Sequence, residues 1–258
     1  MKSIDLNCDM GESYGAYKLG MDDKIMKYIS SANIACGFHA GDPQVMDKTV
    51  KMAVENSVAV GAHPGYPDLM GFGRRSMTLT QDEIKQYLIY QTGALKGFCR
   101  VNKAKLQHVK PHGALYLDAV DNVDIARSIA EGIIDFDPDL KFVALAGKKG
   151  ETMRLVGEEM GLKVVYEAFP DRAYTPEGTL VSRKEFGAVI SDPELVAKRA
   201  LDMANGFIKA VDGSMINLEV QTLCVHGDNL AAVELVKTIR DVLQANDIKI
   251  KSIGENLL

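Results

Sequence analysis

The sequence predicts an α/β protein in which short buried strands alternate with helices and form a parallel sheet. Two observations lead to this fold class. Short apolar runs recur along the chain, and amphipathic helical patterns with recognisable start signals lie between them. Near-continuous apolar runs are typical of parallel strands that are covered on both faces. The pattern fits either a closed barrel or an open doubly wound sheet.

Seven segments fit the pattern expected of strands. Each is brief, rich in β-branched or aliphatic residues, and bounded by glycine, proline or polar residues. No G-x-G-x-x-G follows the first segment, so a dinucleotide-binding sheet is disfavoured. The predicted strands cover residues 2–7, 31–36, 58–62, 106–109, 142–146, 163–168 and 222–226.

Helix start signals stand between the predicted strands. A carboxylate before proline caps the first turn and places proline where its missing N–H costs little. A Thr-x-x-Glu capping box serves the same purpose. Asp42 and Asp228 fit a capping role as well as a catalytic one. The signals are Asp42-Pro43, Thr80-x-x-Glu83, Asp192-Pro193 and Asp228.

The chain shows no internal repeat, low-complexity stretch or linker, so residues 1–258 are expected to form a single domain. Two polar segments, 64–76 and 169–187, are too long to be tight connections between a strand and a helix. Loops of this length in a compact domain are usually lids or binding loops. We therefore expect both segments to border a functional site.

Composition and charge narrow the function classes. The formal net charge is −5 and basic residues form no block, so nucleic acid and anionic membranes are not expected partners. No apolar run is long enough to predict a transmembrane helix, and the polar N-terminus does not resemble a secretory signal. The four cysteines are scattered, without a C-x-x-C pair, which indicates reduced thiols and a cytoplasmic protein.

Polar side chains collect where the predicted strands end. Four of the five histidines lie at such ends, and the fifth, His108, lies within a strand and is interpreted as structural. A single strand-end histidine is often only structural, but the carboxyl ends of parallel strands share one rim, where barrel enzymes build active sites. The candidate residues at this rim are Asn7, Asp9, His39, His63, Arg75, Lys110, His112, Tyr116, Asp171, Arg172, His226 and Asp228.

Two kinds of chemistry fit these residues. Histidine and aspartate suit zinc or another divalent ion in metal-assisted hydrolysis, although no H-x-x-x-H or H-E-x-x-H spacing occurs. Amide or phosphate chemistry without a tightly held metal would use a histidine or aspartate as general base, with Lys110 and Arg172 stabilising anionic charge. The candidate metal ligands are Asp9, His39, His63 and His226.

Six motifs resemble those of the LamB/YcsF family. They occur in the family's order from residue 5 to about 229, so the resemblance covers most of the chain, and none departs from the family's pattern. The motifs are DLNCDMGES, SANIACGFHAGD, VGAHPGYPD followed by GFGRR, VKPHGALY, EAFPDRAYTPEGTLVSR and CVHGDN.

The resemblance implies a distorted (β/α) barrel of about seven parallel strands, similar to the glycoside hydrolase/deacetylase barrel. It also implies ring opening of 5-oxo-L-proline to L-glutamate, coupled to hydrolysis of ATP with a divalent cation, Mg²⁺ being expected. The implied partners are subunits B and C of a 5-oxoprolinase. Under this interpretation the catalytic residues are Asp9, His39, His63, Lys110 and His112, and the other rim residues bind the substrate.

Two other interpretations remain. The first is a stand-alone metal-dependent deacetylase or amidase on the same barrel. The second is a binding or scaffolding subunit that holds the substrate while its partners perform the chemistry. A homo-oligomer is compatible with each of them, and the residues alone leave open whether a metal is tightly bound.

Overall fold

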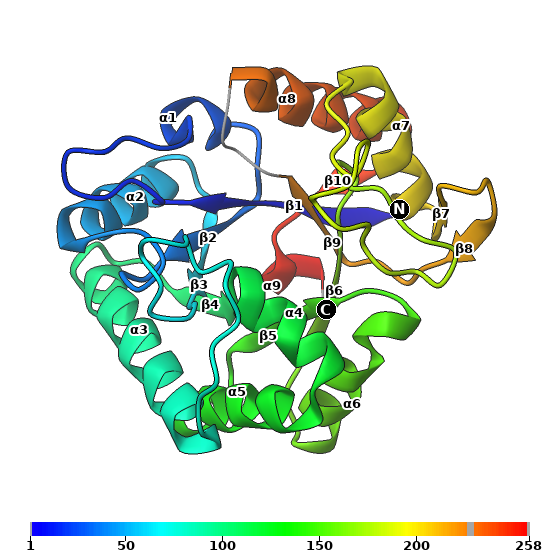
Figure 1. The fold of residues 1–258 in the computed structure, drawn as a ribbon. Helices are drawn as coiled ribbons and strands as arrows, with labels where there is room; N and C mark the ends of the chain where they lie inside the picture. Colours follow the sequence, from blue (N-terminus) through cyan, green and yellow to red (C-terminus); the bar gives the residue numbers. More distant parts are fainter. Residues whose placement is uncertain (1, 226–229, 257–258) are drawn as a thin grey trace.

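The computed structural model describes residues 2–225 and 230–256, and its central element is a closed barrel of parallel strands (Figure 1). Strands β1 to β6 and β9 pair in sequence order, and β9 also pairs with β1 and so closes the barrel. Each predicted strand overlaps an observed one, and the closed barrel is confirmed over the open sheet. The barrel strands are β1 (Ser3–Met10), β2 (Ser31–Ala35), β3 (Ala59–His63), β4 (Leu106–Val109), β5 (Lys141–Leu145), β6 (Val164–Ala168) and β9 (Thr222–Val225).

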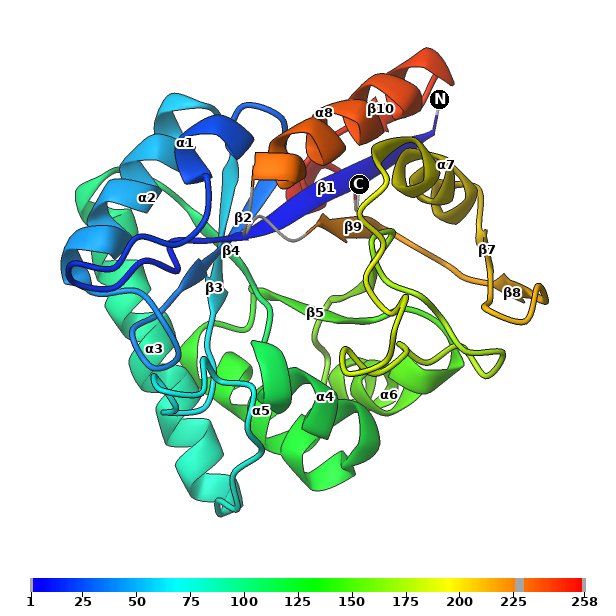
Figure 2. The same cartoon turned by 45° about the horizontal axis from the view of Figure 1, so that its top comes forward.

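Helices surround the barrel and cover its outer face (Figures 1 and 2). Outward-facing strand residues such as Leu6 and Ile34 are completely buried under this layer. None of the described helices is long and apolar enough to cross a membrane. The helices are α1 (Asp22–Ile25), α2 (Pro43–Glu55), α3 (Gln81–Val101), α4 (Gly113–Asp121), α5 (Val123–Phe136), α6 (Glu151–Glu159), α7 (Pro193–Ala204), α8 (Leu230–Ala245) and α9 (Ile253–Asn256), with one 3-10 turn at Lys148–Gly150.

The predicted helix starts are confirmed wherever the structure describes them. Asp42 caps α2 by accepting hydrogen bonds from two backbone N–H groups of its first turn. Thr80 and Glu83 form both hydrogen bonds of the capping box of α3, and Asp192 caps α7. Asp228, expected to begin the last long helix, lies outside the described residues.

Three short strands were not predicted. β7 (Phe207–Lys209) and β8 (Met215–Asn217) form an antiparallel hairpin outside the barrel, and β10 (Lys249–Ile250) pairs with the N-terminal end of β1. They have two or three residues each, which is too short for a hydrophobic period to show in the sequence.

The barrel interior is polar, which differs from the uniformly apolar strands that the sequence suggested. Asp5, Asn7 and Asp9 alternate along β1 and point inward. Asn7 Nδ2 donates to Glu167 Oε1 at 3.1 Å across the barrel, and Asn33 Nδ2 donates to Asn7 Oδ1 at 2.7 Å and to Asp9 Oδ1 at 2.8 Å. These bonds satisfy polar groups that would otherwise be costly to bury.

His108 is a structural member of this interior, as the sequence predicted. Its ring is fully buried, and Nε2 lies 2.8 Å from Asn33 Oδ1. Residue 61 on the neighbouring strand is glycine because a Cβ there would collide with the His108 ring. The network thus crosses the barrel from wall to wall and supports the strand ends above it.

Candidate active site

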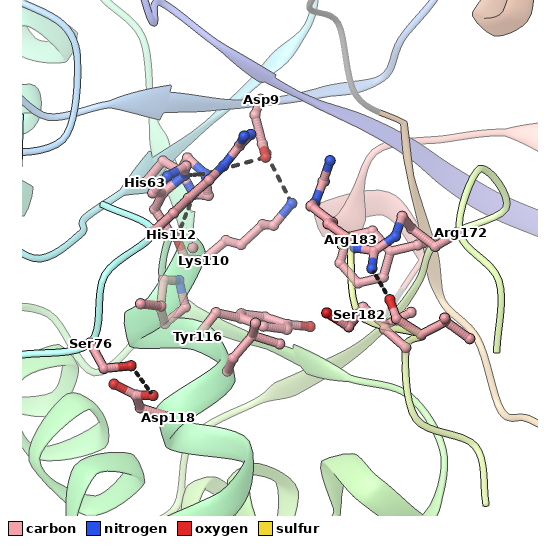
Figure 3. Close-up of a pocket in the computed structure, with 18 of the residues that line it drawn as sticks. Asp9, His63, Ser76, Lys110, His112, Tyr116, Asp118, Arg172, Ser182 and Arg183 are labelled. Carbon is pink, nitrogen blue, oxygen red and sulfur yellow. Dashed lines mark hydrogen bonds and ion pairs between the residues drawn. The ribbon is translucent and has the colours of Figure 1, made fainter. Parts of the chain in front are cut away.

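A cavity of about 600 Å³ opens at the carboxyl end of the barrel (Figure 3). Its floor is formed by residues at strand ends, and its walls come from helix α4 and from both segments predicted to be binding loops. The residues that line it include Asp9, Glu12, His63, Arg74, Lys110, His112, Tyr116, Phe169, Arg172 and Arg183.

Lys110 is buried beneath the cavity, and its ammonium group is fully engaged within the protein. Nζ lies 2.9 Å from Asp9 Oδ1, 3.0 Å from Glu167 Oε1 and 3.0 Å from Cys224 Sγ. Burial lowers the pKa of Lys110, but Asp9, Cys224 and Glu167 outweigh it and hold this pKa well above its usual value. A lysine has three N–H donors. The predicted role of Lys110 in binding anionic charge on a substrate is therefore disfavoured, and its contacts indicate that it orients Asp9.

Asp9 is a charge-balanced carboxylate at the cavity floor. Its Oδ1 accepts hydrogen bonds from Lys110 and Asn33, and its Oδ2 lies 3.3 Å from His63 Nε2. The side chain is only 13% exposed, and the cavity provides that exposure. A carboxylate in this setting can orient a water molecule or take a proton from it.

Three histidines from three different connections meet beside Asp9 (Figure 3 labels two of them). His63 ends β3, His112 precedes α4, and His39 follows β2. The rings of His39 and His112 are stacked, with centroids 3.7 Å apart and an interplanar angle of 2°. His112 Nδ1 lies 2.9 Å from His63 Nε2. His39 is buried behind this pair and does not line the cavity.

The rings of His39 and His112 are neutral near pH 7. Burial, reinforced by His112 and His63, lowers the pKa of His39 well below its usual value. Burial, reinforced by His63, lowers the pKa of His112 to about 3. Neutral imidazole is the form that binds metal ions.

Glu12 joins the three histidines in a group whose donor atoms could hold a metal ion. One donor atom from each of Glu12, His39, His63 and His112 lies within 4.8 Å of the others. The ligand set predicted from the sequence had Asp9 and His226 in place of Glu12 and His112. Asp9 is instead held by Lys110 and Asn33.

Two predicted substrate-binding residues, Tyr116 and Arg172, line the cavity. Arg172 also fastens the loop that forms the wall, because its Nε donates to Ala188 O at 3.2 Å and its Nη2 donates to Val181 O at 2.6 Å. The Tyr116 hydroxyl is buried, and burial together with the nearby Glu167 raises the pKa of Tyr116 well above its usual value.

Three predicted residues lie away from the cavity surface. Asn7 belongs to the interior network below Asp9. Arg75 is largely exposed and pairs with Asp68, whereas its neighbour Arg74 lines the cavity. Asp171 is buried outside the cavity wall. In irregular loops no period indicates which of two adjacent side chains points inward, so the choice between the two arginines could not be made from the sequence.

The predicted set also lacked several residues of the site. Glu12 stands just after β1, and Glu167 is an inward-facing residue of β6; both are acidic residues at strand ends, which was the available signal. Arg74 carried the same signal as its neighbour. His226 and Asp228, also predicted, lie outside the described residues.

Comparison with known proteins identifies the family. The LamB/YcsF family model matches residues 4–257. The chain belongs to the LamB/YcsF family. A relative in this family, the 5-oxoprolinase A subunit of Pyrococcus horikoshii, is 55% identical over 253 residues, which are 98% of each chain.

Solved structures confirm the barrel expected of the LamB/YcsF family. The crystal structure of a lactam utilization protein from Thermus thermophilus has a TM-score of 0.92 at 44% identity and covers 98% of this chain and 100% of that one. The structure of the T48 deacetylase with substrate has a TM-score of 0.51 at 13% identity, covering 99% of this chain and 90% of that one. The second likeness concerns the fold alone.

Proposed function

We propose that this chain is the A subunit of an ATP-dependent 5-oxoprolinase, which hydrolyses the cyclic amide of 5-oxo-L-proline to L-glutamate together with subunits B and C. The similarity to a 5-oxoprolinase A subunit over 98% of both chains supports this proposal. The structural observation that carries it is Asp9, held by Lys110 beside His63 at the floor of a cavity that suits a small ligand. We further propose that residues 1–258 act as one domain in the cytoplasm.

The chemistry of a five-membered lactam accounts for the use of ATP. The amide is unactivated and the closed ring is favoured, so phosphorylation of the lactam oxygen by Mg²⁺-ATP would activate the ring carbon. Water then adds to that carbon, and the ring C–N bond breaks as a proton goes to nitrogen. Hydrolysis of the resulting acyl phosphate releases glutamate and phosphate. Asp9, with His63 beside it, would accept the proton of the attacking water.

Basic residues in the cavity wall suit the anionic parts of this substrate. Arg74 lies over the Phe72 ring, 4.9 Å from its centroid, and lines the cavity together with Arg172 and Arg183. A guanidinium group can bind a carboxylate or a phosphate through two parallel hydrogen bonds. We propose that Arg74 takes the anion-binding role that the sequence suggested for Arg75.

Reconstitution tests this function directly. Release of glutamate from 5-oxo-L-proline is measured with each subunit omitted in turn and with ATP and Mg²⁺ varied. We expect release only when all three subunits and Mg²⁺-ATP are present. Release by the partners without this chain would refute the proposal. Variants of the cavity floor that lose 5-oxoproline binding but keep ATP turnover would favour the scaffolding role instead.

A second candidate function is favoured by one observation. The group formed by Glu12, His39, His63 and His112 would suit a stand-alone metal-dependent deacetylase or amidase. That function predicts amide cleavage by the isolated chain with zinc and without ATP. The same reconstitution distinguishes the two candidates, because one of its arms contains this chain without any partner.

A further inference from the structure

Hydrogen bonds to backbone carbonyls fix the tautomers of His63 and His112. His63 Nδ1 lies 2.7 Å from the carbonyl oxygen of Lys110, and His112 Nε2 lies 2.8 Å from that of Phe72. A carbonyl oxygen only accepts, so each of these two ring nitrogens carries a hydrogen. In neutral rings the other two nitrogens, His63 Nε2 and His112 Nδ1, are then both acceptors.

These two acceptors face each other at 2.9 Å. Two lone pairs at this distance repel each other unless a positive species satisfies both. A proton shared between the rings is one such species, but it would create a charged imidazolium where burial disfavours charge. A metal ion is the other, and it binds the neutral rings as they stand.

His39 supplies an independent observation in favour of a metal ion. Its side chain is completely buried, and neither ring nitrogen has a hydrogen-bond partner among the described residues. A buried polar group without a partner is costly. A proton shared by His63 and His112 would leave this cost in place, whereas coordination of an ion by His39 would remove it.

We propose that a divalent transition-metal ion, zinc by preference, binds at this cluster through His63 Nε2 and His112 Nδ1, with His39 and Glu12 completing the donor set. Imidazole nitrogens suit zinc, and the carbonyls behind the two rings orient them as outer-shell partners do in metal sites. Two zinc-bound imidazole nitrogens are ~3.3 Å apart in tetrahedral geometry. The rings therefore need to separate only slightly.

Glycines at two positions leave room for the cluster. A Cβ at position 65 would lie 2.8 Å from His39 Nδ1, and one at position 73 would lie 2.7 Å from His112 Cδ2. A larger residue at either position would displace a ring. The donor set contains three imidazoles and one carboxylate, whereas Mg²⁺ prefers oxygen ligands. The site is thus distinct from any site for Mg²⁺-ATP.

The ion would lie next to the cavity floor, because His63, His112 and Glu12 all line the cavity. As a Lewis acid it would polarise a carbonyl oxygen held there. This catalytic role rests on the proposed function, whereas binding of the ion does not.

The test uses the purified full-length chain without partners or ATP. The chain is stripped with a chelator, dialysed against Zn²⁺ in the presence of a weak competing chelator, and analysed by plasma mass spectrometry. We expect about one zinc per chain. His63→Gln and His112→Gln should each weaken binding by more than about tenfold, since even outer-shell partners are worth about 10–100-fold. His108→Gln is the matched control, a buried histidine outside the donor set, and should bind zinc like the wild type.

Cobalt gives a second measurement that needs no variant. Co²⁺ bound to the wild-type chain should show the visible absorption of a four- or five-coordinate ion with nitrogen ligands, and Zn²⁺ should displace it. Absence of stoichiometric zinc in the wild type would overturn the proposal, as would wild-type affinity in a folded His63→Gln/His112→Gln double variant. An imidazolium signal from this pair in ¹⁵N spectra, unchanged by zinc, would also overturn it.

The outcomes separate this proposal from the proposed function. Zinc binding without glutamate release by the assembled enzyme would refute the function and leave the metal site standing. Glutamate release by an assembled enzyme in which this chain cannot bind zinc would refute the metal site and leave the function standing.

Discussion

The Nζ atom of Lys110 lies 2.9 Å from Oδ1 of Asp9, and the two side chains are 3% and 13% exposed. The same ammonium lies 3.0 Å from Glu167 Oε1, so one positive charge balances two carboxylates. The cavity floor therefore carries excess negative charge. Such a floor can accept a proton from water and can hold a cation nearby.

Lys110→Met should destabilise the protein strongly. The substitution leaves the carboxylates of Asp9 and Glu167 buried without their partner, which typically costs about 3–5 kcal/mol. Urea denaturation measures the free energy of unfolding. Lys149→Met is the control, because Lys149 forms an exposed pair with Asp121, and exposed pairs contribute little. Equal losses in the two variants would contradict the account.

The stability of the protein should fall as pH rises from about 4 to about 6 through Asp5. Burial raises the pKa of Asp5 from 3.8 to about 6, although hydroxyl donors, Thr222 first among them, lower it. The folded-state pKa lies above the unfolded one, so the folded protein binds more protons in this window. Rising pH then removes up to about 3 kcal/mol of stability.

Asp5→Asn should remove this component of the pH dependence. Unfolding free energies of both proteins, measured by urea denaturation from about pH 4 to about pH 7, should converge or cross in favour of the variant as pH rises. Curves that run parallel across the whole range would show that Asp5 titrates as it does in the unfolded chain.

Gly73→Ala should reduce activity through the histidine rings. Gly73 has a φ of +63°, and a Cβ there would lie 2.7 Å from His112 Cδ2 and 2.8 Å from His39 Cβ. Displacing these rings should lower glutamate release by about tenfold or more. The control is Gly161→Ala, which has the same kind of backbone, with a φ of +84°, but no atom within 4 Å of the new Cβ.

Both glycine variants should lose about 1–2 kcal/mol of stability from the left-handed backbone. Only the variant at position 73 should lose activity, measured in the reconstituted enzyme at a temperature where both variants are folded. Similar activity in the two variants would mean that the positions of the rings do not matter for the reaction.

Arg172→Ala should loosen the wall of the cavity. The variant loses two hydrogen bonds from a charged group to the carbonyls of Val181 and Ala188, each worth about 1.5–3 kcal/mol. Local opening of this loop should become easier, and trypsin should cleave after Arg183 about tenfold faster or more. Arg154→Ala, on the exposed surface of α6, is the control. An unchanged cleavage rate would show that Arg172 does not hold the loop.

The fold was predictable because its signals are local. Apolar runs indicated the seven barrel strands, and the capping residues Asp42, Thr80 and Asp192 each begin a helix in the structure. The convergence of Asp9, His63, Lys110 and His112 also followed from the sequence, because parallel strands end at one rim.

The rest of the site depends on contacts across the barrel that no local pattern contains. Asp5, Asn7 and Asp9 alternate in the sequence, but only closure of the barrel shows that their shared face is the interior. Lys110 carried a positive charge in the sequence with no sign that Glu167, far along the chain, would occupy one of its donors.

Asp9→Asn in the assembled enzyme tests the central claim most directly. The amide keeps the shape of Asp9 and an acceptor for Lys110, but it cannot take a proton from water. Glutamate release at saturating ATP should fall by about 10²–10⁴-fold, while unfolding by urea and assembly with the partner subunits stay close to wild type. Release within about twofold of the wild-type rate would contradict the account.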